Sequence, residues 1–305
     1  MLALTGCTGK IGGAILQALL EYRLLPPTEL VVCTSSDPND SRWDSLKAKG
    51  ITVLQSNFND PESMVRAFSG CSSLLLVSSP EVSLDFNDAP AGNGRERHHI
   101  NAINAAQVAG VQHIYYTSLA FGAKSGAGVM RAHLHTEAFL ERQKITSTVI
   151  REGLYNESWP LYFGFYDLEK DNRDAVLVAG DGPISWTSID DLGFATASIL
   201  AAPSTAYAGQ TLYLSSPTAI TLEEVARIIS NIKGMEIELK VVSREEYCKF
   251  YAEKGVDKAM VEWWSTTYGA LEQNECLIKD GTVTRLLSSK GSKPKSIEDT
   301  IREML

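Results

Sequence analysis

The chain has 305 residues, 44% of them hydrophobic, which is enough for one large domain or one and a half domains with a substantial core. A net charge of -9 argues against nucleic acid or an anionic membrane surface as a partner. Five scattered cysteines without a Cys-x-x-Cys pair indicate a reducing compartment. No apolar run approaches the ~20 residues of a membrane helix, and no basic leader precedes the first predicted strand, so we expect a cytoplasmic protein.

A short strand, a glycine-rich turn and a helix open the chain. Residues 1–4 are apolar, and apolar side chains at helical spacing run from Ile11 to Glu21. Between them, glycines would make the tight turn, let a pyrophosphate approach the backbone and let the helix pack closely, with phosphates bound by free amides. A turn that merely needs glycine is the alternative, and a P-loop is excluded because Ile11 follows Lys10. The predicted dinucleotide contacts are Gly6, Thr8, Gly9, Lys10, Ile11 and Gly12.

The tip of the second predicted strand, residues 29–33, bears on the type of nucleotide. An acidic side chain there would hold the ribose hydroxyls of NAD and repel the 2′-phosphate of NADP. The tip instead has Thr34, Ser35 and Ser36, and the first acid is Asp37. Because hydroxyl groups donate hydrogen bonds to phosphate, the tip favours NADP, although an ordinary polar loop would have the same composition.

Two further strands are predicted, at residues 51–55 and 74–77. The second is continuously apolar, as expected for a strand covered on both faces. The residues after the first lie where such folds border the adenine ring, and those after the second lie at the carboxyl edge, where open α/β sheets bind ligands. We assign the following residues to the cofactor site: Asn57, Phe58, Ser78 and Ser79.

Helices and strands continue to alternate to about residue 151. Residues 85–96 are rich in Asp, Asn, Gly and Pro, and we expect a mobile loop there, a candidate lid. The pattern then predicts a helix, a strand, a helix and a strand at 97–109, 113–117, 131–143 and 147–151. This alternation predicts an α/β fold with a doubly wound parallel sheet of the Rossmann type over residues 1–153.

From residue 154 the pattern changes. Strands are predicted at 175–179 and 211–214, and one long helical stretch is predicted from Arg244 to about Leu271. Four capping-box patterns open helices, at Ser188, Thr221, Ser243 and Ser296. We expect a smaller α/β substrate-side lobe over residues 154–305. The two lobes are expected to be interleaved, so the boundary is approximate.

Seven stretches together are more specific than the glycine turn alone: Thr5–Gly12, Leu74–Ser79, Asn101–Ala106, Tyr116–Leu119, Ala132–Glu137, Val149–Gly153 and Gly180–Gly182. On these residues the chain resembles the NmrA-like, atypical short-chain dehydrogenase/reductase family, and most of all its NADPH-dependent quinone oxidoreductase type 2 branch. The resemblance implies NADP(H) as cofactor. Some members of the family reduce quinones or related double bonds and others are sensors with little or no turnover, while related reductases act on plant phenolics and on intermediates of natural products.

The resemblance also points to His133. Hydride transfer to a carbonyl needs a group that stabilises the developing oxyanion, and ordinary short-chain dehydrogenases use a Tyr-x-x-x-Lys pair. The one match here, Tyr166 to Lys170, lies beyond the sixth strand, and we interpret it as chance. His133 occupies the position at which isoflavone-reductase-like relatives have a lysine. We predict it as the catalytic group, oriented by Glu137 one turn later. A helix histidine without a role is the alternative.

Side chains after strands five and six complete the predicted site. Ser118 and Asn156 are predicted as catalytic-site residues that position the substrate. Tyr155 and Trp159 are predicted to form an aromatic wall of the substrate pocket, suited to a flat molecule. Ser118 would equally end a strand, and the two aromatic residues would equally fill a hydrophobic junction between the lobes.

The histidine pairs do not suggest a metal site. His98 and His99 are neighbours in the sequence, and His135 faces away from His133 on a helix, so neither pair makes a good chelate. We therefore predict no metal.

These observations lead to three hypotheses of function. The first is NADPH-dependent reduction of a planar, electron-poor small molecule such as a quinone. The second is an NADP(H)-binding redox sensor without turnover, which is compatible with the missing Tyr-x-x-x-Lys pair. The third is a natural-product enzyme that reduces an iminium or enone, or catalyses a cyclisation in the redox pocket. The sequence does not determine the oligomeric state, and a homodimer is compatible with it.

Overall fold

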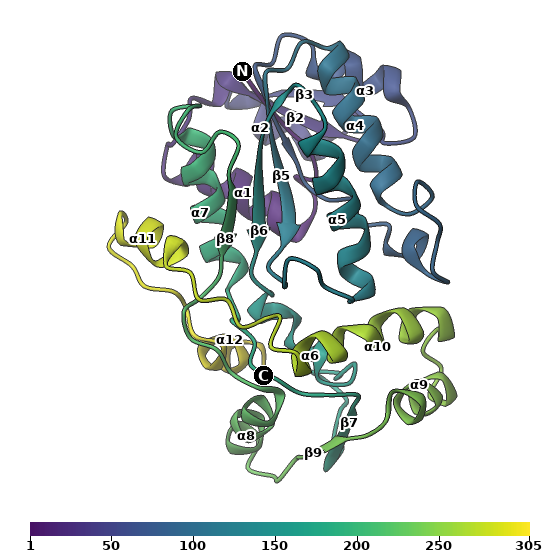
Figure 1. Cartoon of the computed structure of the whole chain (residues 1–305). Coiled ribbons are helices and arrows are strands. Elements are labelled where there is room, and N and C mark those ends of the chain that lie inside the picture. Colours follow the sequence, from purple (N-terminus) through teal and green to yellow (C-terminus); the bar gives the residue numbers. More distant parts are fainter.

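A parallel sheet of seven strands forms the centre of the larger lobe in the computed structural model, which describes residues 1–305 (Figure 1). The strand order is β3-β2-β1-β4-β5-β6-β8, so the order reverses between β1 and β4, as in a doubly wound fold. The strands are β1 (Leu2–Leu4), β2 (Leu30–Thr34), β3 (Thr52–Gln55), β4 (Ser73–Leu76), β5 (His113–Leu119), β6 (Thr146–Glu152) and β8 (Thr211–Leu214). The predicted Rossmann-type fold is therefore confirmed.

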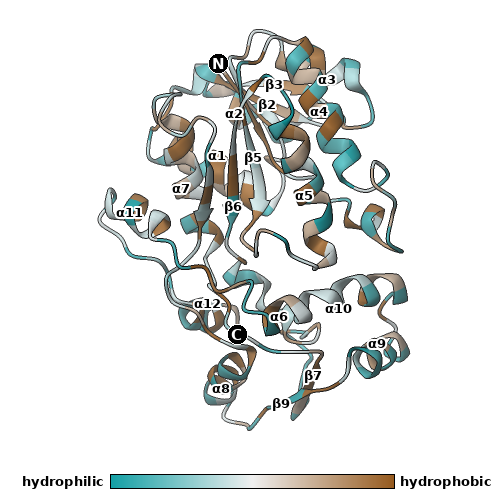
Figure 2. Cartoon of the chain, in the orientation of Figure 1, coloured by the Kyte–Doolittle hydropathy of each residue, from teal (hydrophilic) through white to brown (hydrophobic).

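Helices cover both faces of this sheet. The core on one face contains residues of α1 (Lys10–Glu21), α7 (Ile189–Ala201) and α11 (Thr282–Ser288). The core on the other contains residues of α3 (Pro61–Phe68), α4 (Glu96–Val108) and α5 (Gly128–Glu141). Successive strand residues alternate between the cores, and both cores are apolar, which is why the inner strands β1, β2 and β4 consist mainly of hydrophobic residues (Figure 2). A short helix, α2 (Asp44–Ala48), lies beside β3.

The smaller lobe has a two-stranded parallel sheet, β7 (Ala175–Val178) with β9 (Glu238–Val241). Its helices are α6 (Trp159–Tyr162), α8 (Leu222–Lys233), α9 (Arg244–Glu253), α10 (Lys258–Glu272) and α12 (Ile297–Met304). An aromatic core holds these elements together, and it includes the fully buried side chains of Trp159, Tyr247 and Tyr268. None of the helices in the molecule combines the length and the apolar character needed to cross a membrane.

One predicted helix is wrong. The stretch from Arg244 to Leu271 is two helices, α9 and α10, rather than one. Gly255 adopts φ +91 between them, a conformation that a continuous helix does not contain, and Asp257 then caps α10 by accepting a hydrogen bond from the amide of Met260. The four predicted capping residues do cap their helices, but only Thr221 forms the reciprocal box, with Glu224.

The chain returns to the main sheet after it has entered the smaller lobe. The strand at 211–214, which we expected in the C-terminal part, pairs with β6 as the edge of the seven-stranded sheet. α7 packs against α1, and α11 packs against α7 and β8. The interleaving therefore extends well beyond residue 153, which marks only the first passage between the lobes.

Candidate functional site

The glycine turn between β1 and α1 has the shape of a phosphate-binding loop. Gly6 adopts φ +69, and a Cβ added there would lie 2.8 Å from the Cβ of Val77. A Cβ at Gly12 would lie 2.2 Å from the carbonyl oxygen of Gly6, so the helix packs onto the turn only because Gly12 has no side chain. Gly9 precedes α1, and no side chain caps this helix, which leaves the amides of its first turn free for an anion.

The remaining predicted residues of this turn differ in whether their side chains are accessible to a ligand. Thr8 and Lys10 are exposed beside the glycines, so both side chains are available to a ligand. The side chain of Ile11 is buried in the core under the sheet, so this residue offers only its backbone. These positions are compatible with a pyrophosphate on the backbone and a cation beside it.

The tip of β2 carries hydroxyl side chains, and no acidic side chain forms a hydrogen bond with them. Thr34 is buried, and its hydroxyl oxygen accepts a hydrogen bond from the amide of Ser36 at 3.1 Å. Ser35 is exposed. The carboxylate of Asp37 accepts from the amide of Asn39 within its own loop. The tip therefore suits a 2′-phosphate better than a free ribose diol.

The predicted adenine-side residues lie after β3. Asn57 is exposed, and its side-chain oxygen accepts from the amide of Asn59 at 2.9 Å. Phe58 stacks on the imidazole of His98, with ring centroids 5.5 Å apart. This contact fixes the ring of Phe58 at the end of the strand while leaving it only half-buried.

The two serines after β4 lie in different surroundings. Ser78 is half-buried, and its amide donates to the hydroxyl of Thr117 at 3.0 Å. Ser79 is buried: its amide donates to Nε2 of His99 at 2.9 Å, and its hydroxyl bonds to Nδ1 of His98 at 2.9 Å. Only Ser78 therefore remains open to a cofactor through its side chain.

The loop at 85–96, which we expected to be mobile, is fixed at its base. Asp85 and Arg95 form a buried ion pair, with Nε of the arginine 2.6 Å from the carboxylate. Arg95 also donates to the carbonyl oxygens of Ser79 and Val129, which ties the loop to β4 and α5. A buried pair with these additional hydrogen bonds holds both ends of the loop in place.

His133 lies on α5 and is buried, with its Nδ1 2.9 Å from the hydroxyl of Tyr116. Burial, with the positive charges of Arg95 and Arg151 nearby, holds the pKa of His133 well below its ordinary value. The imidazole is therefore neutral at pH 7. Its Nε2 has no hydrogen-bond partner in the protein and is not one of the fully enclosed polar atoms.

The surrounding hydrogen bonds determine which nitrogen of His133 carries the proton. Nε2 of His99 accepts from the Ser79 amide, so the proton of this neutral ring lies on Nδ1, which donates to Thr136 at 2.7 Å. The hydroxyl of Tyr116 therefore cannot donate to His99 and must donate to Nδ1 of His133. The proton of His133 is then on Nε2, the nitrogen that no protein group occupies.

Glu137 does not orient His133, contrary to our expectation. Its carboxylate pairs with Arg151, at 2.6 Å and 3.1 Å, and accepts from the hydroxyl of Ser118 at 2.6 Å. The guanidinium of Arg151 is buried and needs a carboxylate partner, and Glu137 is the one within reach. The same network occupies the hydroxyl of Ser118.

Asn156 and Trp159 lie inside the smaller lobe. The side-chain amide of Asn156 donates to the hydroxyl of Thr300 at 3.0 Å and to two carbonyl oxygens at the start of α12. Trp159 is fully buried and packs against Tyr166, with ring centroids 5.3 Å apart. Both side chains are fully buried, with Oδ1 of Asn156 and Nε1 of Trp159 unpaired, whereas Tyr155 is only half-buried.

An acid that the sequence analysis did not consider, Glu152, lies at the end of β6. It is buried, accepts a hydrogen bond from the hydroxyl of Tyr155 at 3.1 Å, and lies 3.4 Å from the hydroxyl of Thr196. Burial raises the pKa of Glu152 to about 8. The sequence signal was present, because an acid directly follows the strand predicted at 147–151, at the carboxyl edge of the sheet.

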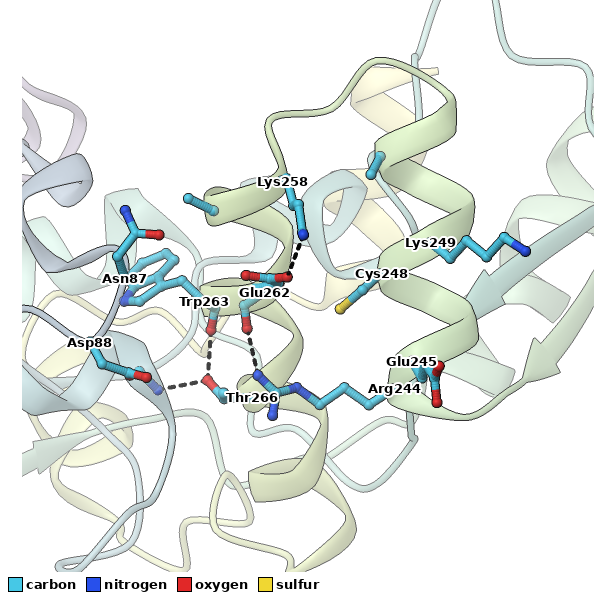
Figure 3. A pocket seen from close by; sticks show the side chains of 13 residues that line it. Asn87, Asp88, Arg244, Glu245, Cys248, Lys249, Lys258, Glu262, Trp263 and Thr266 are labelled. Carbon is cyan, nitrogen blue, oxygen red and sulfur yellow. Dashed lines mark hydrogen bonds and ion pairs between the residues drawn. The ribbon is translucent and has the colours of Figure 1, made fainter.

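A cavity of about 710 Å³ opens between the 85–96 loop, the start of α5 and helices α9 and α10 (Figure 3). Its wall includes Trp263 and the thiol of Cys248, with the Lys258–Glu262 ion pair at its rim. None of the predicted site residues lines it. No group of three or more His, Cys, Asp or Glu side chains is arranged to hold a metal ion.

Comparison with known proteins places this site in a family. The model of the NmrA-like family matches residues 1–273. The chain belongs to the NmrA-like family. An NmrA-like family domain-containing oxidoreductase, flvB of Aspergillus flavus, is 29% identical over 99% of this chain and 94% of its own length.

Two solved structures are similar over the full length of the chain. Quinone oxidoreductase 2 of Escherichia coli, in complex with NADPH, has a TM-score of 0.82 at 25% identity, covering 100% of this chain and 99% of its own. Triphenylmethane reductase of Citrobacter sp., in complex with NADP(H), has a TM-score of 0.80 at 28% identity and covers both chains completely (100% each). One relative is thus named an oxidoreductase and the other a reductase, and they were solved with NADPH and NADP(H) respectively.

Proposed function

We propose that this NmrA-like protein is an NADP(H)-dependent oxidoreductase that reduces a planar, electron-poor small molecule, with quinones as the first class to test. The glycine turn carries this proposal. Its packing at Gly6 and Gly12 excludes side chains, and the uncapped start of α1 offers free amides to a pyrophosphate. The likeness to reductases solved with NADPH or NADP(H) supports the same nucleotide here.

The residues along the sheet edge would hold NADP(H) in a consistent order. The backbone of residues 9–12 would bind the pyrophosphate, with Lys10 beside it. The tip of β2 would take the 2′-phosphate, and Phe58 would border the adenine. When bound, the reduced nucleotide supplies a hydride.

His133 is the residue that we assign to the acceptor. Its Nε2–H is free to donate a hydrogen bond to the oxygen on which negative charge develops. Tyr116 fixes the ring by donating to the opposite nitrogen. We give this role to His133 rather than to Ser118, whose hydroxyl already donates to Glu137, or to Asn156, whose amide nitrogen donates within the smaller lobe and whose side chain is buried. Tyr155 is the one predicted pocket residue with an accessible ring.

The first test is consumption of NADPH by the purified protein with a panel of quinones, enones and iminium ions. We expect oxidation of NADPH with at least one class, and much weaker activity with NADH because the tip of β2 has no acid for the ribose hydroxyls. The absorbance of NADPH gives the rate, and a reaction without acceptor is the control. Tight NADPH binding with no oxidation by any acceptor would contradict the proposal.

A redox sensor without turnover is the second candidate. The internal bonding of the Ser118 hydroxyl and of the Asn156 amide nitrogen favours it, because it leaves fewer hydrogen-bond donors for a substrate. The same panel separates the two functions. A sensor predicts different affinities for NADPH and NADP⁺ and no loss of NADPH, whereas a reductase consumes it.

A further inference from the structure

Arg95 is a buried cation beside the site that has no role in the proposed reaction. It is the residue directly before α4, and only 4% of it is exposed. A buried guanidinium must have its charge balanced and its N–H groups bonded. The carboxylate of Asp85 balances the charge and accepts a hydrogen bond from Nε at 2.6 Å. The two terminal nitrogens remain for other partners.

These two nitrogens donate to carbonyl oxygens on separate elements. Nη1 lies 3.3 Å from the carbonyl oxygen of Ser79, in the segment after β4. Nη2 lies 3.2 Å from the carbonyl oxygen of Val129, in the first turn of α5. Because both nitrogens belong to one rigid, planar group, they fix the distance between the two carbonyl groups. A single side chain therefore joins the end of β4, the start of α5 and the 85–96 loop.

Both carbonyl groups bear on the place of hydride transfer. The glycine turn belongs to the half of the sheet formed by β1–β3, which binds one mononucleotide. The second mononucleotide therefore falls on the ends of β4–β6, where Ser79 lies. Val129 precedes His133 on α5 by ~6 Å along the helix axis, about one turn. A movement of the start of α5 relative to β4 would therefore change the distance from His133 to the bound nucleotide.

Ser79 also connects Arg95 to the proton arrangement of the histidines. Its amide donates to Nε2 of His99, and this bond puts the remaining proton of His99 on Nδ1. The hydroxyl of Tyr116 then donates to His133. Arg95 binds the carbonyl group of the same serine, so the bond between Ser79 and His99 depends on where the guanidinium holds this segment.

The charge of Arg95 acts in the same direction. After burial, it is the largest cause that lowers the pKa values of both His99 and His133. Each carboxylate of the cluster is already paired with an arginine, so no free negative charge favours an imidazolium. The other charged groups that act on the cluster come from the loop, α5 and β6: Asp85, Glu137 and Arg151.

We propose that Arg95 is a positioning residue for hydride transfer. Its guanidinium sets the position of α5, and with it Nε2 of His133, relative to the end of β4. Arg95 itself is buried and acts through these two elements rather than on the substrate. This inference rests on the proposed reductase function, in which His133 stabilises the charge that develops on the acceptor.

The test variant is Arg95→Lys, which keeps a cation beside Asp85 but replaces the planar fork by a single ammonium group. We expect kcat with the best acceptor to fall ~10-fold or more, because a misplacement of about 1 Å lowers rates by up to ~10²-fold. The Kd for NADPH should stay close to the wild-type value, since the glycine turn is unchanged. A slower hydride step should also increase the kinetic isotope effect with NADPH deuterated at both C4 positions.

Arg131→Lys is the matched control. Arg131 also joins α5 to the loop, by donating to the carbonyl oxygen of Asp85 and by an ion pair with Asp88, but it does not bond to Ser79. We expect this variant to keep the wild-type kcat and isotope effect. If it loses as much activity as Arg95→Lys, attachment of the loop explains the loss and the proposal fails.

A second measurement does not depend on turnover. Nitrogen NMR of protein labelled at histidine distinguishes protonated from unprotonated ring nitrogens. In the wild type we expect the proton of His133 on Nε2 and that of His99 on Nδ1. In Arg95→Lys we expect mixed tautomers at both rings. A loss of stability alone would leave the tautomers of the folded molecules unchanged.

The outcomes separate this inference from the proposed function. A wild type that oxidises no NADPH would overturn both. An active wild type, with either the kcat or the tautomers unchanged in Arg95→Lys, would overturn only the role of Arg95. Thermal unfolding of both variants shows whether a loss of activity reflects a loss of fold.

Discussion

At the scale of single residues, the site depends on how buried polar groups share protons. His99 must donate from Nδ1 because its other nitrogen accepts a backbone amide, and this leaves the hydroxyl of Tyr116 with His133 as its acceptor. One backbone hydrogen bond thus determines which nitrogen of His133 is free. Such coupling through a network is why buried polar clusters hold a single arrangement.

His133→Ala tests this arrangement directly. Loss of a donor to the developing oxyanion should lower kcat by ~10² to 10³-fold, with little change in the Kd for NADPH, because His133 does not contact the glycine turn. His135→Ala is the matched control on the same helix, since the His135 side chain is 40% exposed. Equal turnover in the two variants would remove His133 from the mechanism.

The sequence analysis predicted His133 as the catalytic group, which stays a prediction, and assigned it the wrong partner. Glu137 has the spacing of a helix neighbour, and that pattern alone suggested that it orients the histidine. In the structure Glu137 instead forms an ion pair with Arg151 of β6. The hydrogen-bond partner of His133 is Tyr116 of β5. Contacts between elements depend on how a helix lies on a sheet, which helix spacing does not encode. The assignment of a role to Asn156 was limited in the same way, because α12 lies far along the chain.

At the scale of elements, the turn between β1 and α1 is the most constrained part of the fold. It brings the helix so close to the strand that a single added methyl group has no space at Gly12. Gly13, the next residue on the same helix, has more room, since its added Cβ would lie 3.3 Å from the nearest backbone oxygen. The two neighbouring glycines therefore offer a matched pair.

Gly12→Ala should weaken NADPH binding at least ~10-fold, because α1 must shift away from the turn and its free amides no longer converge on the phosphates. It should also lower Tm. Gly13→Ala should leave the affinity close to wild type and gain some helix stability, because alanine favours helix more than glycine does. Fluorescence titration with NADPH gives the affinities. Wild-type affinity in Gly12→Ala would contradict this reading of the turn.

The bounds of strands and helices could be predicted from the sequence where the local pattern of apolar and polar residues determines them. The seven strands of the main sheet lie within two residues of their predicted ends because each has apolar or β-branched residues bounded by polar turns. The single helix predicted across α9 and α10 failed because the aromatic residues keep a helical spacing through the break. Gly255 and Asp257 carry the signal for a helix end and a new cap, and they were outweighed by that spacing.

At the scale of the whole molecule, the buried titratable groups determine how stability depends on pH. Burial lowers the pKa values of four of the five histidines, His98, His99, His113 and His133, so the unfolded chain binds protons below about 6.5 that the folded protein excludes. Glu152 acts in the opposite sense: its raised pKa stabilises the fold fully below about 4.5, and this contribution is lost as pH rises towards 8.

We therefore expect the free energy of unfolding to be greatest near pH 6.5. It should fall steeply towards pH 5, by ~1.4 kcal/mol per pH unit for each histidine kept neutral, and decline gently towards pH 8. Urea unfolding across this range measures it, and Glu152→Gln should flatten the alkaline decline. A free energy that stays constant from pH 7 to pH 5 would show that the histidines are not buried as neutral groups.

The chain passes between the main sheet and the smaller lobe five times. It enters the lobe after β6, returns for α7 and β8, leaves after Leu214, comes back for α11 and leaves again for α12. A hinge works when one or two connections absorb the change in backbone angles. Five connections have to bend together, so the lobes cannot swing apart as rigid bodies. Opening of the sheet edge to nucleotide and acceptor is therefore confined to small shear movements between packed helices.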